Sequence, residues 1–169
     1  MEKSDKSIHN ICIASIKRST MKPYDFKWTR FYEGNADFMN SFPDIEIDLS
    51  ANELVICSTF IDIANFSVLT TQKLATKEEG KFLSCNLDGA IDKPDGLYKD
   101  FKGVREKEPL TFGRVQLDNG NDFRYFIERG SASMVMVHGI RTRIQTGEMT
   151  NSQMDKVAAI WTRKIENRL

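Results

Sequence analysis

The spacing of apolar residues changes along the chain, and each change marks a different kind of secondary structure. Near the N-terminus, Ile8 and Ile11 belong to a set of apolar residues at helical spacing, which predicts a helix over residues 5–18. Ser4 or Asp5 is the expected N-cap, because a side-chain oxygen at that position accepts a hydrogen bond from an amide of the first turn. We therefore expect the chain to begin with a capped helix.

Apolar and polar residues alternate through the middle of the chain, a pattern typical of half-buried antiparallel strands. Residues 118–121 read Asp-Asn-Gly-Asn between two such segments, which predicts a hairpin because Asn and Gly tolerate a positive φ angle. Residues 65–76 are expected to form a strand, a Thr70-Thr71 bend and a second short strand. The expected strands, in chain order, cover residues 24–28, 44–49, 53–61, 65–76, 81–91, 98–104, 110–117 and 122–128.

Helical spacing returns near the C-terminus. Residues 132–145 suit either a helix or a strand, and we favour a helix because Gly130 and Ser131 are start signals. Thr150 followed by Gln153 forms a capping box, and an apolar stripe at helical spacing comes after it. The stripe consists of Met154, Val157, Ala158, Trp161, Ile165 and Leu169. Because strands are grouped before these helices instead of alternating with them, the pattern predicts a single compact α+β domain.

Composition argues against several classes of function. The 24 basic and 24 acidic residues cancel, so no net charge indicates binding to nucleic acid. No apolar run approaches the roughly 18 residues of a membrane span. Cys12, Cys57 and Cys85 form no CxxC pair, so we expect buried free thiols in a cytoplasmic protein. No P-loop, GxGxxG, HExxH or zinc pattern exists, Gly113 and Gly139 stand alone, and we expect neither a metal nor a cofactor.

Charge is nevertheless distributed unevenly along the chain. The stretch from Glu33 to Asp62 holds seven acidic residues and no basic ones, whereas both ends of the chain are basic. Within it, Asp44, Glu46 and Asp48 alternate with apolar residues and so share one face of an expected strand. Three such carboxylates are most often the solvent side of an edge strand. Two other interpretations stay open, namely a surface for a basic partner and a site for a divalent cation.

Two further groups of residues are candidates for binding a partner. Residues 24–42 are rich in aromatic side chains, among them Trp28 and Tyr32, and these residue types anchor interfaces as well as cores. Arg141 and Arg143 offer guanidinium groups for bidentate contacts with a phosphate or a carboxylate. The plainer interpretations are core packing for the aromatic residues and a solvated helix end for the arginines.

Residues 69–74, LTTQKL, resemble a motif of bacterial pleckstrin-homology-like and GRAM-type domains, in which a strand runs into LTxxRL. Lys73 stands where those domains usually have arginine. The segment CNLDGAID at 85–92, the Asn-Gly hairpin and a closing helix follow in the family's order. The resemblance implies an antiparallel sheet or partly closed barrel over residues 50–169, capped by the C-terminal helix. Residues 1–49 would then pack on it as an N-terminal helix and an aromatic, acidic extension.

Domains of that kind mostly bind other proteins, lipid headgroups or copies of themselves, so the resemblance implies binding and not catalysis. The leading hypothesis is a non-enzymatic bacterial protein-binding module, in one concrete form an immunity protein that covers a basic site of a cognate toxin with its acidic segment. An alternative is a membrane-surface adaptor that binds lipid headgroups through lysine-bearing loops. A second alternative is a small enzyme that uses His138 beside Arg141 or Arg143.

Overall fold

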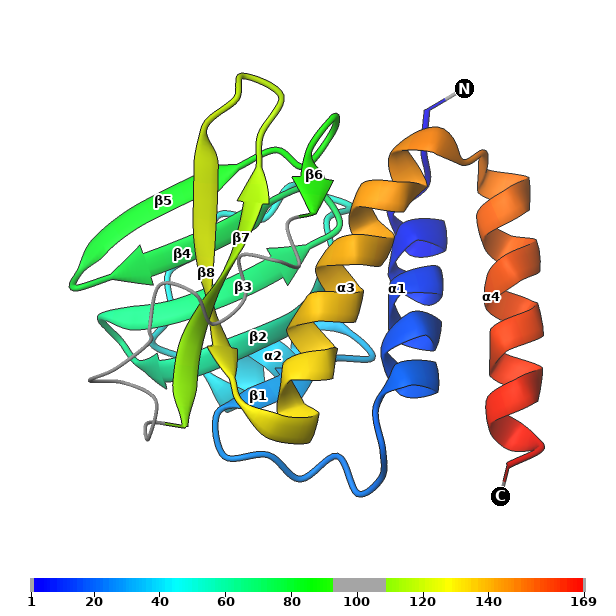
Figure 1. The fold of residues 1–169 in the computed structure, drawn as a ribbon, viewed down its shortest axis with the longest axis horizontal. Helices are drawn as coiled ribbons and strands as arrows, with labels where there is room; N and C mark the ends of the chain where they lie inside the picture. The colour runs from blue at the N-terminus through cyan, green and yellow to red at the C-terminus, as the bar shows by residue number, and fades with distance from the viewer. Residues whose placement is uncertain (1, 93–108, 169) are drawn as a thin grey trace.

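The computed structural model describes residues 2–92 and 109–168, which form two antiparallel sheets and four α-helices (Figure 1). The predicted α+β class is therefore confirmed. The elements in chain order are α1 (Asp5–Ser19), β1 (Thr29–Phe31), α2 (Asn35–Ser41), β2 (Val55–Asp62), β3 (Asn65–Thr70), β4 (Leu74–Glu78), β5 (Lys81–Cys85), β6 (Ile91–Asp92), β7 (Leu110–Gln116), β8 (Asp122–Glu128), α3 (Ser133–Gln145) and α4 (Asn151–Glu166), with short 3-10 turns at Gly130–Ala132 and Thr146–Glu148.

The larger sheet contains strands β1 to β5 in sequence order, each antiparallel to the next. Tight turns fix this order. Between β4 and β5, Glu79 and Gly80 have φ angles of 49° and 82°, the left-handed conformation that a two-residue hairpin turn requires. Between β2 and β3, the Asp62 carboxylate accepts a hydrogen bond from the Ala64 amide at 2.8 Å. The sheet is thus a meander, with β1 and β5 at its two edges.

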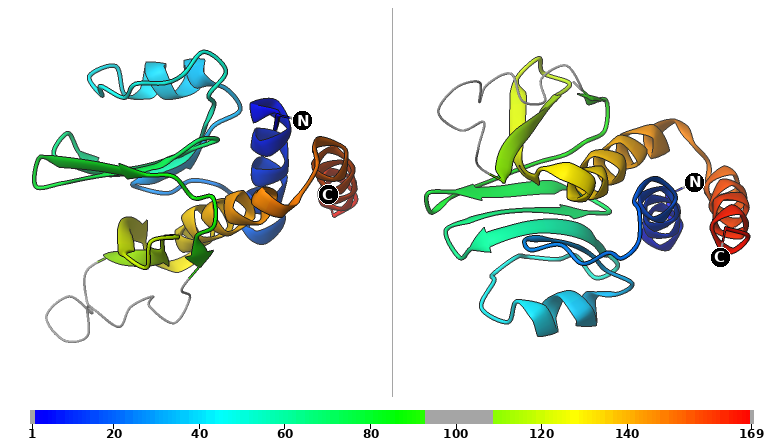
Figure 2. Two further views of the ribbon diagram at one scale, coloured as in Figure 1. Left: turned by 90° about the horizontal axis from the view of Figure 1, so that it is seen from above. Right: turned by 60° about the horizontal axis from the view of Figure 1, so that its bottom comes forward.

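The smaller sheet, β6-β7-β8, packs on one face of the larger sheet. Its hairpin between β7 and β8 turns at the predicted Asn-Gly sequence, where Gly120 has a φ angle of 86°. Two hydrogen bonds join the sheets: Thr76 Oγ1 donates to the Arg124 carbonyl at 3.0 Å, and the Phe126 amide donates to Ser67 Oγ at 2.8 Å. Figure 2 shows the resulting layers, with α2 on one side of the larger sheet and the smaller sheet and α3 on the other.

The three long helices lie together at one end of the sheets, and α1 contacts both α3 and α4 (Figure 1). Ser4 is the N-cap of α1, and Thr150 and Gln153 form the predicted capping box of α4. Helix α1 belongs to the main core, because Ile11 and Ile16 are buried in the same cluster as residues of β2 and α3.

A pleckstrin-homology-like barrel is not confirmed. Within the described residues the two sheets stay separate and do not close into a barrel. The C-terminal helix α4 has its main contacts with α1, and only Met154 and Ala158 of this helix are buried. It therefore covers a helix, whereas the resemblance implied that it would close one end of a barrel.

A second core cluster lies on the face of the larger sheet that carries α2. Residues 43–50 run across this face after a turn at 43–44, and the apolar side chains of Ile45, Ile47 and Leu49 pack into the cluster. The predicted strand over 44–49 is wrong, because these residues form no ladder with any described strand. The alternating pattern nevertheless predicted correctly which side chains of 44–49 face the core and which face solvent. The cluster consists of Tyr32, Phe38, Phe42, Ile45, Ile47, Leu49, Val55, Phe60, Phe66 and Val68.

The predicted strand over 24–28 is also wrong, because strand β1 begins at Thr29. The Glu128 carboxylate explains the difference. It accepts hydrogen bonds from the amides of Lys27 and Trp28 at 3.1 and 3.0 Å, so the amides of these two residues bond to a side chain and not to a strand. The strand predicted over 98–104 lies outside the described residues.

Candidate functional site

The three carboxylates of Asp44, Glu46 and Asp48 are exposed on the outer side of the α2 layer. They stay there because the apolar residues between them are held in the second core cluster. No ion pair involves any of the three within the described residues. Asp44 lies in the turn that follows α2, and Glu46 and Asp48 alternate with the anchored residues, so the three carboxylates form a short row on the solvent side.

The other acidic residues between Glu33 and Asp62 mostly have structural partners. Glu33 forms an ion pair with Lys17 at 2.6 Å, and Asp62 holds the β2–β3 turn. Glu53 is buried, with its carboxylate accepting from the Ser50 amide at 2.9 Å and lying 3.4 Å from the ammonium of Lys73.

Asp37, another exposed acidic residue of the stretch, likewise forms no ion pair with a residue that the structure describes. We call Asp37, Asp44, Glu46 and Asp48 the acidic surface. Lys73 does not neutralise this surface, because its ammonium bonds the main-chain carbonyl of Asp48 and faces the Glu53 carboxylate. No described lysine or arginine therefore forms an ion pair with the carboxylates of the acidic surface.

Neither aromatic candidate is available to a partner in the way that the sequence suggested. Tyr32 is 2% exposed, and its hydroxyl bonds Ser58 Oγ at 2.7 Å; burial raises the pKa of this phenol. Trp28 is half-buried, and the ammonium of Lys27 lies 4.5 Å from the centre of its ring. Tyr32 is therefore a core residue. The ring of Trp28 is only partly exposed, and Lys27 covers one of its faces.

The two arginine candidates differ from each other. Arg143 is 5% exposed, and its Nε donates to the Thr71 carbonyl at 2.6 Å while Nη1 pairs with Asp88 at 3.2 Å. Arg141 is half-buried and pairs with Asp92 at 2.8 Å. The guanidinium of Arg143 is therefore buried and used within the fold, whereas that of Arg141 is partly exposed and binds Asp92 through Nε.

Both histidines have a lowered pKa. His138 is half-buried, and desolvation lowers its pKa with help from Arg141 and Arg18. His138 does not line the grooves at α1 and α4, at β5, at β1 and α2, or at the start of α1. His9 is buried, and desolvation lowers its pKa although its Nε2 lies 2.8 Å from the Tyr32 carbonyl oxygen.

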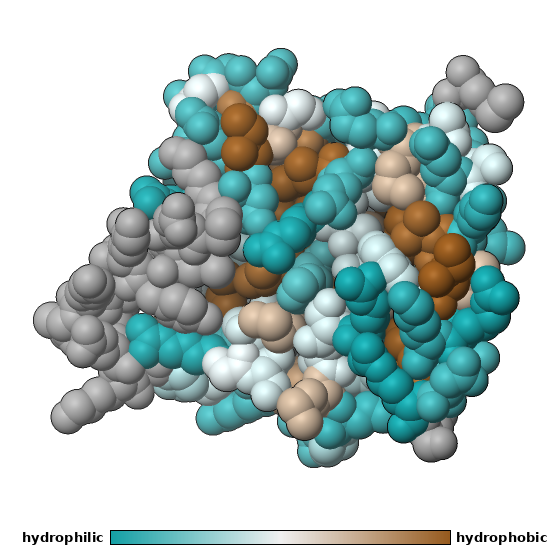
Figure 3. Space-filling model, turned by 45° about the vertical axis from the view of Figure 1, so that its right-hand side comes forward, coloured by the Kyte–Doolittle hydropathy of each residue, from teal (hydrophilic) through white to brown (hydrophobic). Residues whose placement is uncertain are grey.

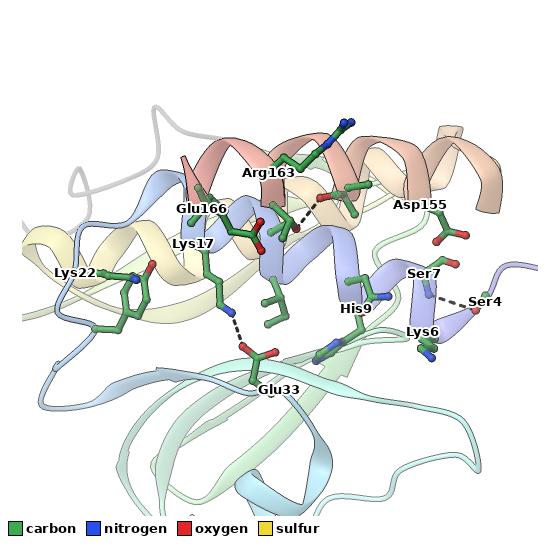
Figure 4. Close-up of a pocket in the computed structure, with 18 residues that line it drawn as sticks. Ser4, Lys6, Ser7, His9, Lys17, Lys22, Glu33, Asp155, Arg163 and Glu166 are labelled. Carbon is green, nitrogen blue, oxygen red and sulfur yellow. Dashed lines mark hydrogen bonds and ion pairs between the residues drawn. The ribbon is translucent and has the colours of Figure 1, made fainter. Parts of the chain in front are cut away.

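A groove of about 1010 Å³ runs between α1, α4 and the segment that precedes α2 (Figure 4). His9 lies on its wall, and the Lys17–Glu33 ion pair crosses it. Its charged side chains are of both signs, so the groove shows no preference for a charged ligand. They are Lys6, Lys17, Lys22 and Arg163 on one hand and Glu33, Asp155 and Glu166 on the other. Sequence reasoning missed this groove because its walls come from opposite ends of the chain.

Two absences in the part of the chain that the structure describes, and the pattern of its surface, are relevant to the hypotheses from sequence. No three His, Cys, Asp or Glu side chains converge there as metal ligands, those of Asp44, Glu46 and Asp48 included. No helix there combines the length and the apolar character needed to cross a membrane. On the side that Figure 3 presents, hydrophilic residues divide the apolar surface into separate patches.

Comparisons with protein-family models, with curated proteins and with solved structures found no match to this chain. The resemblance to pleckstrin-homology-like domains around residues 69–74 therefore stays a prediction.

Proposed function

We propose that this protein is a non-enzymatic module that binds a basic region of a partner protein through its acidic surface. One observation carries the proposal: Asp44, Glu46 and Asp48 face solvent without ion pairs, on a segment whose alternate residues are fixed in a core cluster. Because the segment is anchored, binding would order little of it, and the entropic cost of association stays small. The three free carboxylates would steer a basic partner toward this face.

In its most concrete form, the partner is a toxin with a basic active site, and binding covers that site. A nuclease-type or other anion-binding site is rich in Lys and Arg, so a row of carboxylates complements it and blocks its substrate. The free thiols Cys12, Cys57 and Cys85 support a reducing compartment such as the cytoplasm as the place of binding.

The test compares the natural chain with a variant carrying D44N, E46Q and D48N as baits in lysates of the source organism. These substitutions remove charge, keep shape and touch no hydrogen bond of the fold. The matched control, D118N with D155N and E166Q, neutralises three exposed carboxylates outside the acidic surface. We expect a basic protein that the natural chain and the control capture and the first variant does not. Equal capture by all three would refute the acidic surface as the binding site.

No contact between described residues supports the two other hypotheses, the membrane-surface adaptor and the enzyme. Of the lysines on which a lipid-binding site would depend, Lys77 and Lys81 lie in β4 and β5 beside Glu78 and Glu79, and Lys93, Lys99 and Lys102 lie outside the described residues. The enzyme hypothesis would need a substrate pocket at His138, and the side chain of Arg141 beside it is bound to Asp92. Both stay predictions.

A further inference from the structure

Strand β5 (Lys81–Cys85) is an edge of the larger sheet, and past the charged Lys81 at its start its centre lacks several features that usually protect such an edge. It pairs with β4 on one side, and no described strand pairs with its other side. Its centre is apolar and exposed, since Phe82 is 42% and Leu83 is 52% accessible to solvent. Natural edge strands generally carry a proline, an inward-facing charge or a bulge, and residues 82–84 have none of these.

The register of the β4–β5 hairpin determines which main-chain groups point outward. In a two-residue hairpin the closing pair, here Glu78 and Lys81, exchanges hydrogen bonds, and hydrogen-bonded pairs then alternate along the ladder. Leu83 therefore bonds to β4, whereas the N–H and C=O groups of Phe82 and Ser84 point away from the sheet. These four outward groups repeat at the spacing that an added strand requires.

A groove of about 630 Å³ lies beside this edge, between the two sheets. Leu83 and Lys81 line it from β5, and Phe123 lines it from β8. Figure 1 shows the tip of the β7–β8 hairpin projecting past β5, so the smaller sheet overhangs the edge of the larger one. The two layers therefore leave a place for one further strand beside β5 and beneath the hairpin.

The charges around this groove largely cancel in pairs. Arg124 forms an ion pair with Glu78, and Arg114 forms one with Asp122 at 3.5 Å. A charged side chain entering the groove would have to compete with these ion pairs. An apolar side chain would cover Leu83 without a cost for burying a charge. The groove therefore favours an uncharged side chain.

We propose that β5 is a docking edge for an extended, uncharged segment of another protein, which adds to the larger sheet as a sixth strand. Main-chain hydrogen bonds to Phe82 and Ser84 would hold the segment. One apolar side chain of it would enter the groove over Leu83, and its neighbour would cover Phe82 on the opposite face. This site is separate from the acidic surface and does not depend on it.

A second copy of the chain is a poorer occupant than a single segment. Pairing two β5 edges would join only about four residues of each copy. So short a contact buries far less area than the roughly 800 Å² per partner of a stable interface. It would also bring two overhanging hairpins to the same face of the joined sheet, since the two-fold axis of an antiparallel pair is perpendicular to the sheet. A lone segment meets one hairpin only.

The test uses a phage-displayed library of random seven-residue peptides, selected on the natural chain. A selected peptide is then synthesised and titrated while amide hydrogen exchange is followed by NMR. We expect uncharged peptides that slow exchange at Phe82 and Ser84, whose amides point outward, and leave Leu83 unchanged because its amide is already bonded to β4. Selection of no peptide, or protection elsewhere, would overturn the proposal.

Two variants make the test specific. Ser84→Pro removes an outward N–H without removing a bond to β4, a position where edge strands tolerate proline, and Ser84→Thr keeps the N–H as the matched control. We expect at least about tenfold weaker peptide binding for the first and no change for the second. Leu83→Arg, which keeps every main-chain group, should also weaken binding and covers the case in which Ser84→Pro misfolds.

Equal peptide binding by Ser84→Pro and Leu83→Arg would contradict the site. Protection of Phe82 and Ser84 that rises with protein concentration, in the absence of peptide, would instead indicate a second copy and also overturn the proposal. The variant that neutralises Asp44, Glu46 and Asp48 should bind the peptides normally, so a failure of the acidic surface and a failure of the β5 edge give different results.

Discussion

Arg143 of α3 donates a hydrogen bond from Nε to the main-chain carbonyl of Thr71 at 2.6 Å, which ties the helix to the bend between β3 and β4. The same bend is bound from two other directions. Thr71 Oγ1 and the side-chain amide of Gln72 donate to the Asp5 carboxylate at the start of α1, and the main-chain amide of Thr71 donates to the Leu54 carbonyl at 2.9 Å. The LTTQKL segment is thus the point where helices α1 and α3 meet the larger sheet.

The hydrogen bond from Arg143 to Thr71 predicts that substitutions of Arg143 and Arg141 will lower stability by different amounts. Arg143→Met should lower the free energy of unfolding by about 2–3 kcal/mol, because it removes a charged donor from a buried carbonyl. Arg141→Met removes only a half-exposed ion pair with Asp92 and should cost less than about 1 kcal/mol. Urea unfolding followed by circular dichroism measures both. Equal losses for the two variants would show that Arg143 is not a structural link.

Gly113 is predicted to resist substitution because of its position opposite Tyr125 in the β7–β8 ladder. A Cβ at Gly113 would lie 2.4 Å from Tyr125 Cζ and 2.7 Å from Ile127 Cδ1, and both of those side chains are buried. Gly113→Ala should therefore lower the free energy of unfolding by about 1–3 kcal/mol. Gly147→Ala is the control, since a Cβ there meets nothing within 4 Å and the change should stay within about 0.5 kcal/mol.

The lowered pKa of His9 predicts that stability falls as the pH drops. The unfolded chain takes up a proton near pH 6.5, whereas the folded protein keeps His9 neutral to a lower pH. Below about pH 6.5 the unfolded state therefore binds more protons, and the free energy of unfolding decreases until the folded-state pKa is reached. His138 contributes with the same sign.

The measurement compares thermal melts of the natural chain and His9→Gln between about pH 7.5 and 5.5. Gln has an amide that can donate to the Tyr32 carbonyl but does not titrate. The variant should show a shallower decline in stability with acidification. Parallel curves for the two proteins would mean that His9 does not contribute to the pH dependence.

The three thiols are predicted to react slowly in the folded protein. Burial raises the pKa of Cys12 and of Cys85 to about 12, and it raises that of Cys57 as well. Because the thiolate is the reactive form, labelling by Ellman's reagent at pH 8 should be at least about a hundredfold slower than in denaturant. Cys85, the partly exposed one, should react first. A thiol that reacts at the rate of the unfolded chain would contradict this environment.

Local patterns in the sequence predicted the three long helices and most strands, because caps, turn residues and side-chain periodicity act over a few residues, but they did not predict α2 at Asn35–Ser41. Ser4, Thr150 and the Asn119-Gly120 turn lie where expected. The strand predicted at 44–49 failed for a physical reason: alternation reports which side of an extended segment is buried, not whether another strand lies beside it. The row of Asp44, Glu46 and Asp48 was consequently found from sequence, although its structural setting was not.

Contacts between distant parts of the chain were not predictable in this way. The buried states of Tyr32 and Arg143 depend on Ser58 and Thr71, and nothing local to either residue indicates such a partner. The same is true of Gly113, which looked like an isolated glycine in the sequence and lies against the Tyr125 ring in the fold. Two of the partner-binding candidates thus became core residues because of contacts made across the fold.

The most direct test of the central claim is the salt dependence of binding to the captured basic partner. The association rate of the natural chain should fall steeply between about 50 and 300 mM salt, since exposed charges are screened over that range. The variant with D44N, E46Q and D48N should associate at least about tenfold more slowly at low salt and lose most of that dependence. Identical rates and identical salt dependence for the two proteins would contradict the account.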